Sequence, residues 1–217
     1  MDVKEQHCTV SGSSLSVKGI SIDFCCRSEY FQVGFPITEW GIEMIVGLLG
    51  SSCSGKSFFL KLLRDAGFYV PMSVTTRPQR EEEMWHLRNV EKREFEKLNA
   101  GGSLCFVTEA FGNLYACMEF SEGAVDGDVA IIITKGNIPE LRKGGGRVVR
   151  ILPSDPQMAM EKIQLLKRGD MERRRTELLA DIAESDGGLV DRVFYNGYDA
   201  ESCWRFLVLM DELRQKK

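Results

Sequence analysis

The stretch GSSCSGKS, residues 50–57, decides the fold of this chain. It fits the pattern G-x-x-x-x-G-K-[ST], and it lies between an apolar run at residues 44–49 and a helical pattern at residues 58–66. A strand, the complete pattern and a helix in succession indicate a phosphate-binding P-loop. A glycine- and serine-rich turn that fits by chance is the alternative, and the flanking strand and helix argue against it.

Each residue type in this loop has a physical role. The glycines permit backbone angles and close approach that a Cβ would block, so successive N–H groups can point at a phosphate. Lys56 would neutralise the β- and γ-phosphates, and Ser57 would ligate Mg²⁺ through its hydroxyl. The following helix presents the positive end of its dipole to the same anion. The residues expected to bind a nucleoside triphosphate here are Gly50, Ser51, Ser52, Cys53, Ser54, Gly55, Lys56 and Ser57.

The composition allows one sizeable hydrophobic core. Of the 217 residues 43% are hydrophobic and 28% charged, a balance that argues against a disordered or collagen-like chain. The formal net charge is −4, so the basic surface typical of nucleic-acid binding is absent. We therefore expect one domain with insertions, no nucleic-acid partner, and local clusters of lysine and arginine that hold phosphate.

Cysteine usage and hydropathy predict a soluble, cytoplasmic protein. The seven cysteines are odd in number and show no C-x-x-C spacing, which fits a reduced setting. No apolar run reaches the roughly 18 residues of a membrane span. The polar start lacks the basic and then apolar profile of a signal peptide. We expect no membrane partner, and nothing in the sequence indicates the oligomeric state.

Residues 1–43 differ from the rest of the chain. They are rich in serine, glycine and threonine at first, and residues 16–24 then alternate with a period of two, which suggests an exposed strand or hairpin. We treat residues 1–43 as an N-terminal extension. Because the strand that leads into the P-loop begins at Met44, an alternative is that translation starts there.

From residue 44 to residue 217 strands and helices alternate. This order predicts an α/β fold of the P-loop kinase type, a parallel sheet with helices on both faces. Strands are expected at residues 43–49, 68–74, 129–134, 147–152 and 192–196, and helices at residues 56–66, 137–143, 155–167 and 199–213. An insertion at about residues 75–126 would bind the acceptor. It holds an extended segment at residues 84–90, a helix at residues 91–99 and an antiparallel hairpin of residues 104–111 and 113–118.

Residues 167–175, KRGDMERRR, are the most basic stretch of the chain. On composition alone such a stretch is a solvated helix surface. Its position between the last helices favours a segment that closes over a triphosphate, because phosphoryl transfer gains much of its rate from positive groups around the transferring phosphate. We therefore expect a short lid at about residues 167–176.

Residues 73–80, SVTTRPQR, resemble the acceptor-binding segment of the guanylate kinase family. Further motifs agree in order, with a G-N-x-Y turn at residues 112–115, a buried strand, a basic lid and V-x-x-N at residues 193–196. The resemblance covers about residues 44–217, and these motifs in register are more specific than any one of them. It implies an enzyme that uses ATP with Mg²⁺ and a phosphorylated small molecule as acceptor.

The resemblance gives acceptor-binding roles to individual residues. Arg77, Arg80 and Tyr115 would clamp the phosphate of the acceptor, and Ser73 would make a polar contact to the acceptor. The chemistry agrees, because planar guanidinium groups offer paired hydrogen bonds to phosphate oxygens. Two arginines within four residues after a strand can converge on one dianion.

The resemblance also assigns the donor side. Arg168, Arg173 and Arg174 look like the lid arginines, and with Lys56 they would be the catalytic residues. Asn196 looks like the asparagine on the adenine side of the ATP site. No covalent enzyme intermediate is needed, because positioning and charge neutralisation carry the transfer.

The chain departs from the family where the guanine ring is recognised. Two acidic residues of guanylate kinases align here with Phe106 and Lys135, and a third acid, beside the magnesium, is missing near Ile133. A pocket built to hydrogen-bond a base discriminates strongly, because unpaired buried polar groups are costly. The loss of these acids leaves three functions open.

The first function is phosphoryl transfer to a nucleoside monophosphate, GMP or dGMP, giving the diphosphate. The second is that of ribose 1,5-bisphosphate kinases, which are similar in P-loop and lid, lack the acidic base readers and have a histidine near the place of His86. Lys135 suits an acceptor with a second anionic group, so it is counted among the acceptor-binding residues. The third is a kinase-shaped binding module without catalysis, against which the intact Lys56 and Ser57 argue.

Overall fold

A four-stranded parallel sheet forms the centre of the fold. The computed structural model describes residues 15–17, 20–22, 43–78, 84–120, 125, 127–165, 171–184 and 188–215. The strands of the central sheet run in the order β10-β9-β3-β8, and every neighbouring pair is parallel. Their bounds are Ile45–Leu49 for β3, Val129–Ile132 for β8, Arg147–Pro153 for β9 and Arg192–Asn196 for β10.

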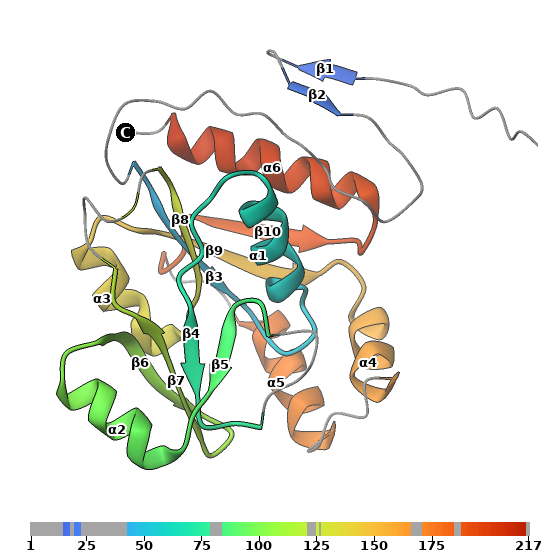
Figure 1. Ribbon diagram of the computed structural model, residues 1–217. Coiled ribbons are helices and arrows are strands. Elements are labelled where there is room, and N and C mark those ends of the chain that lie inside the picture. The colour runs from blue at the N-terminus through green and yellow to red at the C-terminus, as the bar shows by residue number, and fades with distance from the viewer. Residues whose placement is uncertain are drawn as a thin grey trace, which may run out of the picture.

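Helices cover both faces of this sheet (Figure 1). The helices of this part are α1 (Lys56–Asp65), α3 (Ile138–Lys143), α4 (Pro156–Leu165), α5 (Met171–Ala183) and α6 (Ala200–Arg214). On the face of α1 and α6, the rings of Phe59, Phe194 and Phe206 pack on one another with β3 and β9 in the same core. α3 packs on the other face, and α4 packs on α5. The predicted α/β fold is confirmed.

A second, smaller sheet carries the predicted acceptor-binding insertion. Its strands run in the order β5-β4-β7-β6, with bounds Leu87–Asn89, Ser73–Thr75, Asn113–Met118 and Leu104–Ala110. The helix α2 (Lys92–Ala100) packs on one face of it through Phe95, against Val74 and Ala116. β6 and β7 form the antiparallel hairpin that the sequence predicts. Because side chains alternate along a strand, the other face of the small sheet is left for a site.

The chain passes from the large sheet to the small sheet within one predicted strand. The sequence predicts a single strand at residues 68–74. In the structure Tyr69 bridges Val129 at the edge of the large sheet, whereas β4 begins at Ser73 in the small sheet. Pro71 lies between them, and proline has no N–H to donate to a ladder. The strand prediction is wrong in this respect.

Within residues 1–43, the structure describes two short strands and Glu43. β1 (Leu15–Val17) and β2 (Ile20–Ile22) pair antiparallel, at the place where the sequence alternates with a period of two. The idea that translation starts at Met44 stays a prediction. Among the described residues, no helix has the length and apolar character that crossing a bilayer requires.

Candidate active site

The P-loop joins β3 to α1 in a shape that favours glycine at two positions. Gly50 has φ +148°, and a Cβ there would lie 2.3 Å from the carbonyl oxygen of Ile151. Gly55 has φ +106°, and a Cβ there would lie 2.4 Å from Nδ2 of Asn196. Residues with a side chain rarely adopt such φ values. The two glycines of the motif therefore let the loop pass close to β9 and β10.

Lys56 lies over the loop at the start of α1. Its Nζ donates to the carbonyl oxygens of Gly50, at 2.7 Å, and Ser51, at 2.6 Å. An ammonium has three N–H donors, so it can exchange one carbonyl for a phosphate oxygen without leaving the loop. The next residue, Ser57, is exposed and lines the same cavity. Both side chains are placed where a bound triphosphate would meet them.

Residues at and after the end of β10 donate hydrogen bonds to backbone carbonyls of the P-loop. Asn196 is 2% exposed, and its Nδ2 donates to the carbonyl oxygen of Ser54 at 2.9 Å while its Oδ1 accepts from the N–H of Tyr198 at 2.8 Å. The hydroxyl of Tyr198 donates to the carbonyl oxygen of Cys53 at 2.7 Å. Burial raises the pKa of this hydroxyl to about 12, so it remains a donor at neutral pH. Asn196 thus has a supporting role that the sequence does not predict, and its place beside adenine stays a prediction.

Two of the predicted lid arginines, Arg173 and Arg174, stand on the first turn of α5. Arg174 donates from Nη1 to the hydroxyl of Ser52 at 2.9 Å. The guanidinium carbons of Arg173 and Arg174 lie 4.3 Å and 4.4 Å from the ring centroid of Phe111, at the turn between β6 and β7. Cation–π contacts of this kind hold a guanidinium over a ring face. The contacts of Arg173 and Arg174 with Phe111 connect α5 to the insertion, and the hydrogen bond of Arg174 to Ser52 connects α5 to the P-loop.

The turn at residues 75–77, with the sequence TTR, and the G-N-x-Y turn at residues 112–115 are joined by hydrogen bonds of Thr75 and Thr76. Thr75 donates from Oγ1 to the carbonyl oxygen of Leu114 at 2.9 Å, and the same Oγ1 accepts from the N–H of Arg77 at 3.1 Å. Thr76 accepts through its Oγ1 from the N–H of Leu114 at 2.9 Å. Tyr115 lies opposite Thr75 in the β4–β7 ladder. The two turns are therefore held together, and Arg77 and Tyr115 both line the same cavity.

The free face of the small sheet also carries Ser73 and Cys117. The two residues lie opposite each other in the β4–β7 ladder, with Ser73 Oγ 3.8 Å from Cys117 Sγ. Burial raises the pKa of the Cys117 thiol to about 11, so the thiol is protonated at neutral pH. A protonated thiol is a poor nucleophile. The Cys117 thiol is therefore not suited to forming a covalent intermediate.

The wall between the two sheets is apolar and hydroxyl-bearing around Phe106, Thr108 and Thr134. Phe106 is buried at a bulge of β6 and has φ +54°. Thr108 within β6 and Thr134, two residues after β8, lie 3.1 Å apart between their Oγ1 atoms. Asn137 accepts through Oδ1 from the N–H and the hydroxyl of Thr134. These groups satisfy one another, so they hold the sheets together.

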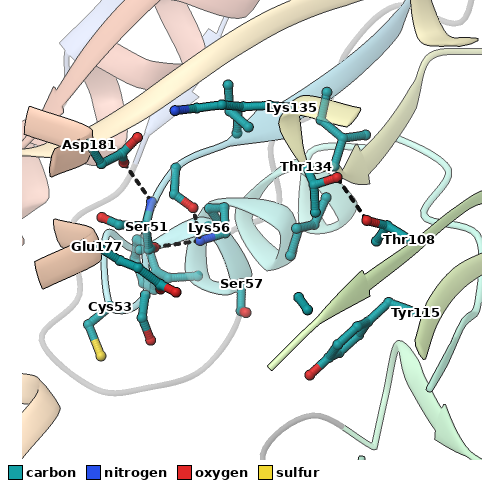
Figure 2. Close-up of a pocket in the computed structure, with 18 of the residues that line it drawn as sticks. Ser51, Cys53, Lys56, Ser57, Thr108, Tyr115, Thr134, Lys135, Glu177 and Asp181 are labelled. Atoms are coloured by element: carbon teal, nitrogen blue, oxygen red, sulfur yellow. Dashed lines mark hydrogen bonds between the residues drawn. The ribbon is translucent and has the colours of Figure 1, made fainter. Parts of the chain in front are cut away.

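One cavity of about 1140 Å³ joins the P-loop to the small sheet (Figure 2). Ligand pockets commonly measure roughly 300–1,000 Å³, so this cavity is just above the upper end of that range. The predicted site residues that line it are Gly50, Ser51, Ser52, Cys53, Gly55, Lys56, Ser57, Ser73, Arg77, Tyr115, Lys135, Arg174 and Asn196. Figure 2 shows Lys56 and Ser57 on one side and Tyr115 on the other.

Some predicted residues are not on the cavity wall. Ser54 of the loop is fully buried. Arg173 contacts the Phe111 ring but does not line the cavity. Arg80 and Arg168 lie outside the described residues. Lys135 lines the cavity as the sequence predicts, but its ammonium forms an ion pair with Glu184, at the end of α5.

Three charged residues of the site are not predicted from the sequence. Asp181 on α5 accepts from the N–H of Ser51 at 2.8 Å, and Arg150 on β9 pairs with Asp181 and Glu184. A sequence signal exists for Arg150 alone, because it interrupts the apolar run of a strand that is buried on both sides. The carboxylates of Asp181 and Glu184 are two among many acidic residues on exposed helices.

The donor set for a magnesium ion is small. Among the residues that the structure describes, no three or more His, Cys, Asp or Glu side chains are grouped to hold a metal ion. Mg²⁺ usually keeps several waters and binds through one or two protein ligands together with the phosphates of a nucleotide. The exposed hydroxyl of Ser57 at the first turn of α1 fits such a site, in which the nucleotide supplies most of the ligands.

A P-loop that faces a second, smaller sheet across one cavity defines the class of this fold as a P-loop kinase fold. Among solved structures the chain is similar to the crystal structure of guanylate kinase from Anaplasma phagocytophilum. The two are 22% identical, the match covers 82% of this chain and 89% of that chain, and the TM-score is 0.59. The resemblance to guanylate kinases is thereby confirmed at the level of the fold. No family model matches the sequence, and no curated protein matches it.

Proposed function

We propose that this protein transfers a phosphoryl group from ATP to a phosphorylated small molecule. The observation that carries the proposal is the shared cavity, which the P-loop lines on one side and Arg77 and Tyr115 line on the other. A donor and an acceptor bound on these two sides would face each other across the cavity, beside Phe111 and α5. Proximity of this kind accounts for much of the barrier that an enzyme removes.

The residues suit a direct transfer. An oxygen of the acceptor's phosphate would attack the γ-phosphorus while the bond to the β–γ bridging oxygen breaks, which leaves ADP and a newly phosphorylated acceptor. Lys56 and Arg174 would offset the charge on the transferring group, and Arg77 and Tyr115 would hold the acceptor's phosphate in line. Magnesium, with Ser57 as its protein ligand, would supply further positive charge to the donor phosphates.

The first candidate acceptor is a nucleoside monophosphate, GMP or dGMP. The fold supports this choice, because a structure similar to this chain over most of its length is described as a guanylate kinase. The cavity volume also leaves room for a nucleoside beside the triphosphate. In this case the base would be recognised by other groups, because Phe106 and Lys135 replace the two carboxylates that the resemblance predicts at these positions.

The second candidate acceptor is a sugar bisphosphate such as ribose 1,5-bisphosphate. Three features of the cavity wall favour it, namely the apolar ring of Phe106, the ammonium of Lys135 and the hydroxyl of Ser73. An ammonium recognises a second phosphate as a point charge, and hydroxyls pair with the hydroxyls of a sugar.

A coupled assay of ADP release tests the proposal. The chain is incubated with ATP and Mg²⁺ and offered GMP, dGMP, AMP, UMP and ribose 1,5-bisphosphate as separate acceptors. Turnover with GMP or dGMP supports the first candidate, and turnover with the sugar bisphosphate alone supports the second. Binding of ATP without turnover on any acceptor contradicts the proposal and indicates a kinase-shaped binding module.

Replacing Arg77 separates acceptor binding from donor binding. In Arg77→Ala we expect KM for the acceptor to rise on the order of tenfold or more, because a charged hydrogen bond to phosphate is lost. KM for ATP should change less than about twofold, since Arg77 follows β4 of the small sheet and is not part of the P-loop. Arg88→Ala is the matched control, because Arg88 is exposed on β5 and pairs with Glu94 instead. An equal rise in both KM values would mean that Arg77 is not part of the acceptor clamp.

Replacing Lys135 separates the two candidate acceptors. Lys135→Met removes the charge and keeps the length, whereas an aspartate would face Glu184. We expect KM for a sugar bisphosphate to rise on the order of tenfold, because one ion pair with phosphate is lost, and KM for GMP to stay unchanged. Lys143→Met, at an exposed position of α3, is the control. Steady-state kinetics with both acceptors would show the difference. If KM for neither acceptor changes, Lys135 is not part of the acceptor site.

A further inference from the structure

One side of α5 lies along the P-loop. Arg174, Glu177 and Asp181 of α5 and Glu184, directly after its last residue, are spaced three, four and three residues apart, which places them along one side of the helix. Arg174 bonds to Ser52, as described above, and all four side chains line the cavity. The helix that carries Arg173 and Arg174 is attached to the loop at a second point, two turns after Arg174.

That second point is the carboxylate of Asp181. Its Oδ2 accepts from the backbone N–H of Ser51 at 2.8 Å, and the residue is 9% exposed. A bond between a carboxylate and a backbone N–H is about twice as strong as one between neutral groups. The bond fixes the peptide between Gly50 and Ser51, directly after β3.

A carboxylate beside a loop that accepts a triphosphate would repel the ligand unless its charge were offset. Arg150 on β9 offsets it. Its Nη2 lies 2.9 Å from Asp181 Oδ1 and also donates to the Asp181 carbonyl, and its Nη1 donates to the Glu184 carbonyl at 3.1 Å. Arg150 is 1% exposed, and a guanidinium does not lose its proton in a protein. Its positive charge is therefore permanent at this place.

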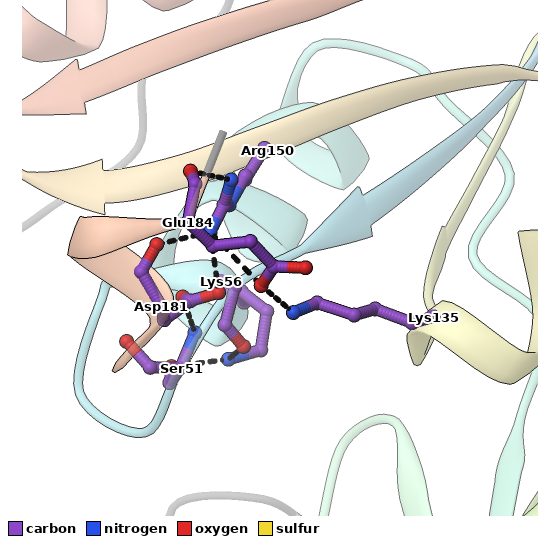
Figure 3. A network of polar contacts seen from close by, with 7 residues as sticks. Ser51, Lys56, Lys135, Arg150, Asp181 and Glu184 are labelled. Atoms are coloured by element: carbon purple, nitrogen blue, oxygen red, sulfur yellow. Dashed lines mark hydrogen bonds and ion pairs between the residues drawn. The ribbon is translucent and has the colours of Figure 1, made fainter. Parts of the chain in front are cut away.

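The network continues to the acceptor side of the cavity. The carboxylate of Glu184 lies 3.7 Å from Arg150 Nη2 and forms an ion pair with Lys135 (Figure 3). The carboxylates of Asp181 and Glu184 alternate with the cations of Arg150 and Lys135 along it, so the group is close to neutral as a whole. A buried charge is tolerated when partners of this kind surround it.

We propose that Asp181 is a positioning residue of the P-loop and that Arg150 is its counter-charge. The pair holds the loop in the shape that receives the phosphates, and it sets the distance between the loop and the arginines of α5. The inference rests on the proposed function for its meaning in catalysis. It predicts an effect on nucleotide binding by itself, in the absence of any acceptor.

Binding of ADP with Mg²⁺ to the full chain, measured by titration calorimetry, tests the proposal. In Asp181→Asn the side chain keeps its size, but one oxygen becomes an NH2 donor that faces either the N–H of Ser51 or the guanidinium of Arg150. We expect the dissociation constant for ADP to rise on the order of tenfold, as for loss of a charged hydrogen bond. Glu212→Gln, at an exposed position of α6, removes the same charge and should leave the constant unchanged.

The titration also distinguishes positioning from general support of the fold. Partial unfolding lowers the measured number of binding sites and leaves the dissociation constant of the folded fraction in place, whereas a displaced loop changes the constant. An Asp181→Asn constant within about twofold of the unmodified chain, or a tighter one, would overturn the proposal. If the unmodified chain binds ADP but transfers no phosphate to any acceptor, the proposed function fails while this test still decides the role of Asp181.

A second variant tests the counter-charge. Arg150→Met leaves Asp181 facing the phosphates without its partner, so ADP should bind more weakly than in Asp181→Asn. Combining the two changes removes the unpaired carboxylate, and ADP affinity should recover to the level of Asp181→Asn alone. Additive losses in the double variant would mean that the two residues act independently and would overturn the assignment of Arg150. If Arg150→Met does not fold, the Asp181→Asn titration decides.

Discussion

Lys56→Ala is expected to lower the rate of phosphoryl transfer more than any other single change. The ammonium is placed over the P-loop, where it would neutralise the phosphates between which the bond breaks. Removing one group that stabilises charge in a transition state costs on the order of a hundredfold to a thousandfold in kcat. The rate of ADP release at saturating ATP, Mg²⁺ and acceptor measures the loss.

The same change should leave the fold intact. Lys56 is bonded to the carbonyl oxygens of Gly50 and Ser51 rather than to the core, and loop carbonyls near the surface can bond to water instead. Thermal unfolding followed by circular dichroism should therefore give a nearly unchanged melting temperature. Lys61→Ala is the matched control, because Lys61 stands on the exposed side of α1 and pairs only weakly with Asp65. Unchanged turnover in Lys56→Ala would refute the role of the P-loop in catalysis.

The sequence predicts the elements of the fold well because their signals are local. The glycines of the P-loop, the apolar runs of β3, β8 and β9 and the period of α1 each lie within about ten residues. The passage between the two sheets is not predicted, because Tyr69 and β4 lie in one apolar run and only their pairing with different strands separates them. Pro71 is the local sign of this division.

The site is predicted only in part for a related reason. Lys56, Arg77 and Tyr115 belong to short motifs, and the structure places all three on one cavity. The bond between Asp181 and Ser51 joins residues that are 130 positions apart, and the pair of Arg150 and Asp181 joins a strand to a helix. No period or spacing in the sequence records such contacts. They depend on how the folded chain brings α5 beside β9 and the P-loop.

The position of Arg174 shows how the two parts of the site are connected. Its guanidinium donates to Ser52 of the P-loop and lies over Phe111 of the insertion. It therefore touches both sides of the cavity at the place where the transferring phosphate would pass. A planar cation at this point can follow the phosphoryl group from donor to acceptor without a large movement of the backbone.

Arg174→Ala is expected to give the second largest loss. Arginines that meet a transferring phosphoryl group account for roughly a thousandfold or more in kcat in related chemistry, and Lys56 would remain to hold the donor. We therefore expect kcat to fall on the order of a hundredfold to a thousandfold, while KM for the acceptor changes by less than about threefold. Single-turnover measurement of ADP formation would separate this effect on the chemical step from a change in product release.

The control for this variant is Arg175→Ala. Arg175 is the next residue of α5, is exposed, and does not line the cavity, so the variant removes the same charge from the same turn. Its kcat should fall no more than a few-fold, because a solvated charge outside the cavity acts on the phosphates only through screened, long-range attraction. Equal losses in the two variants would mean that the net charge of the helix matters rather than the contact of Arg174 with Ser52 and Phe111. A loss confined to Arg174→Ala would place the catalytic charge at this one guanidinium.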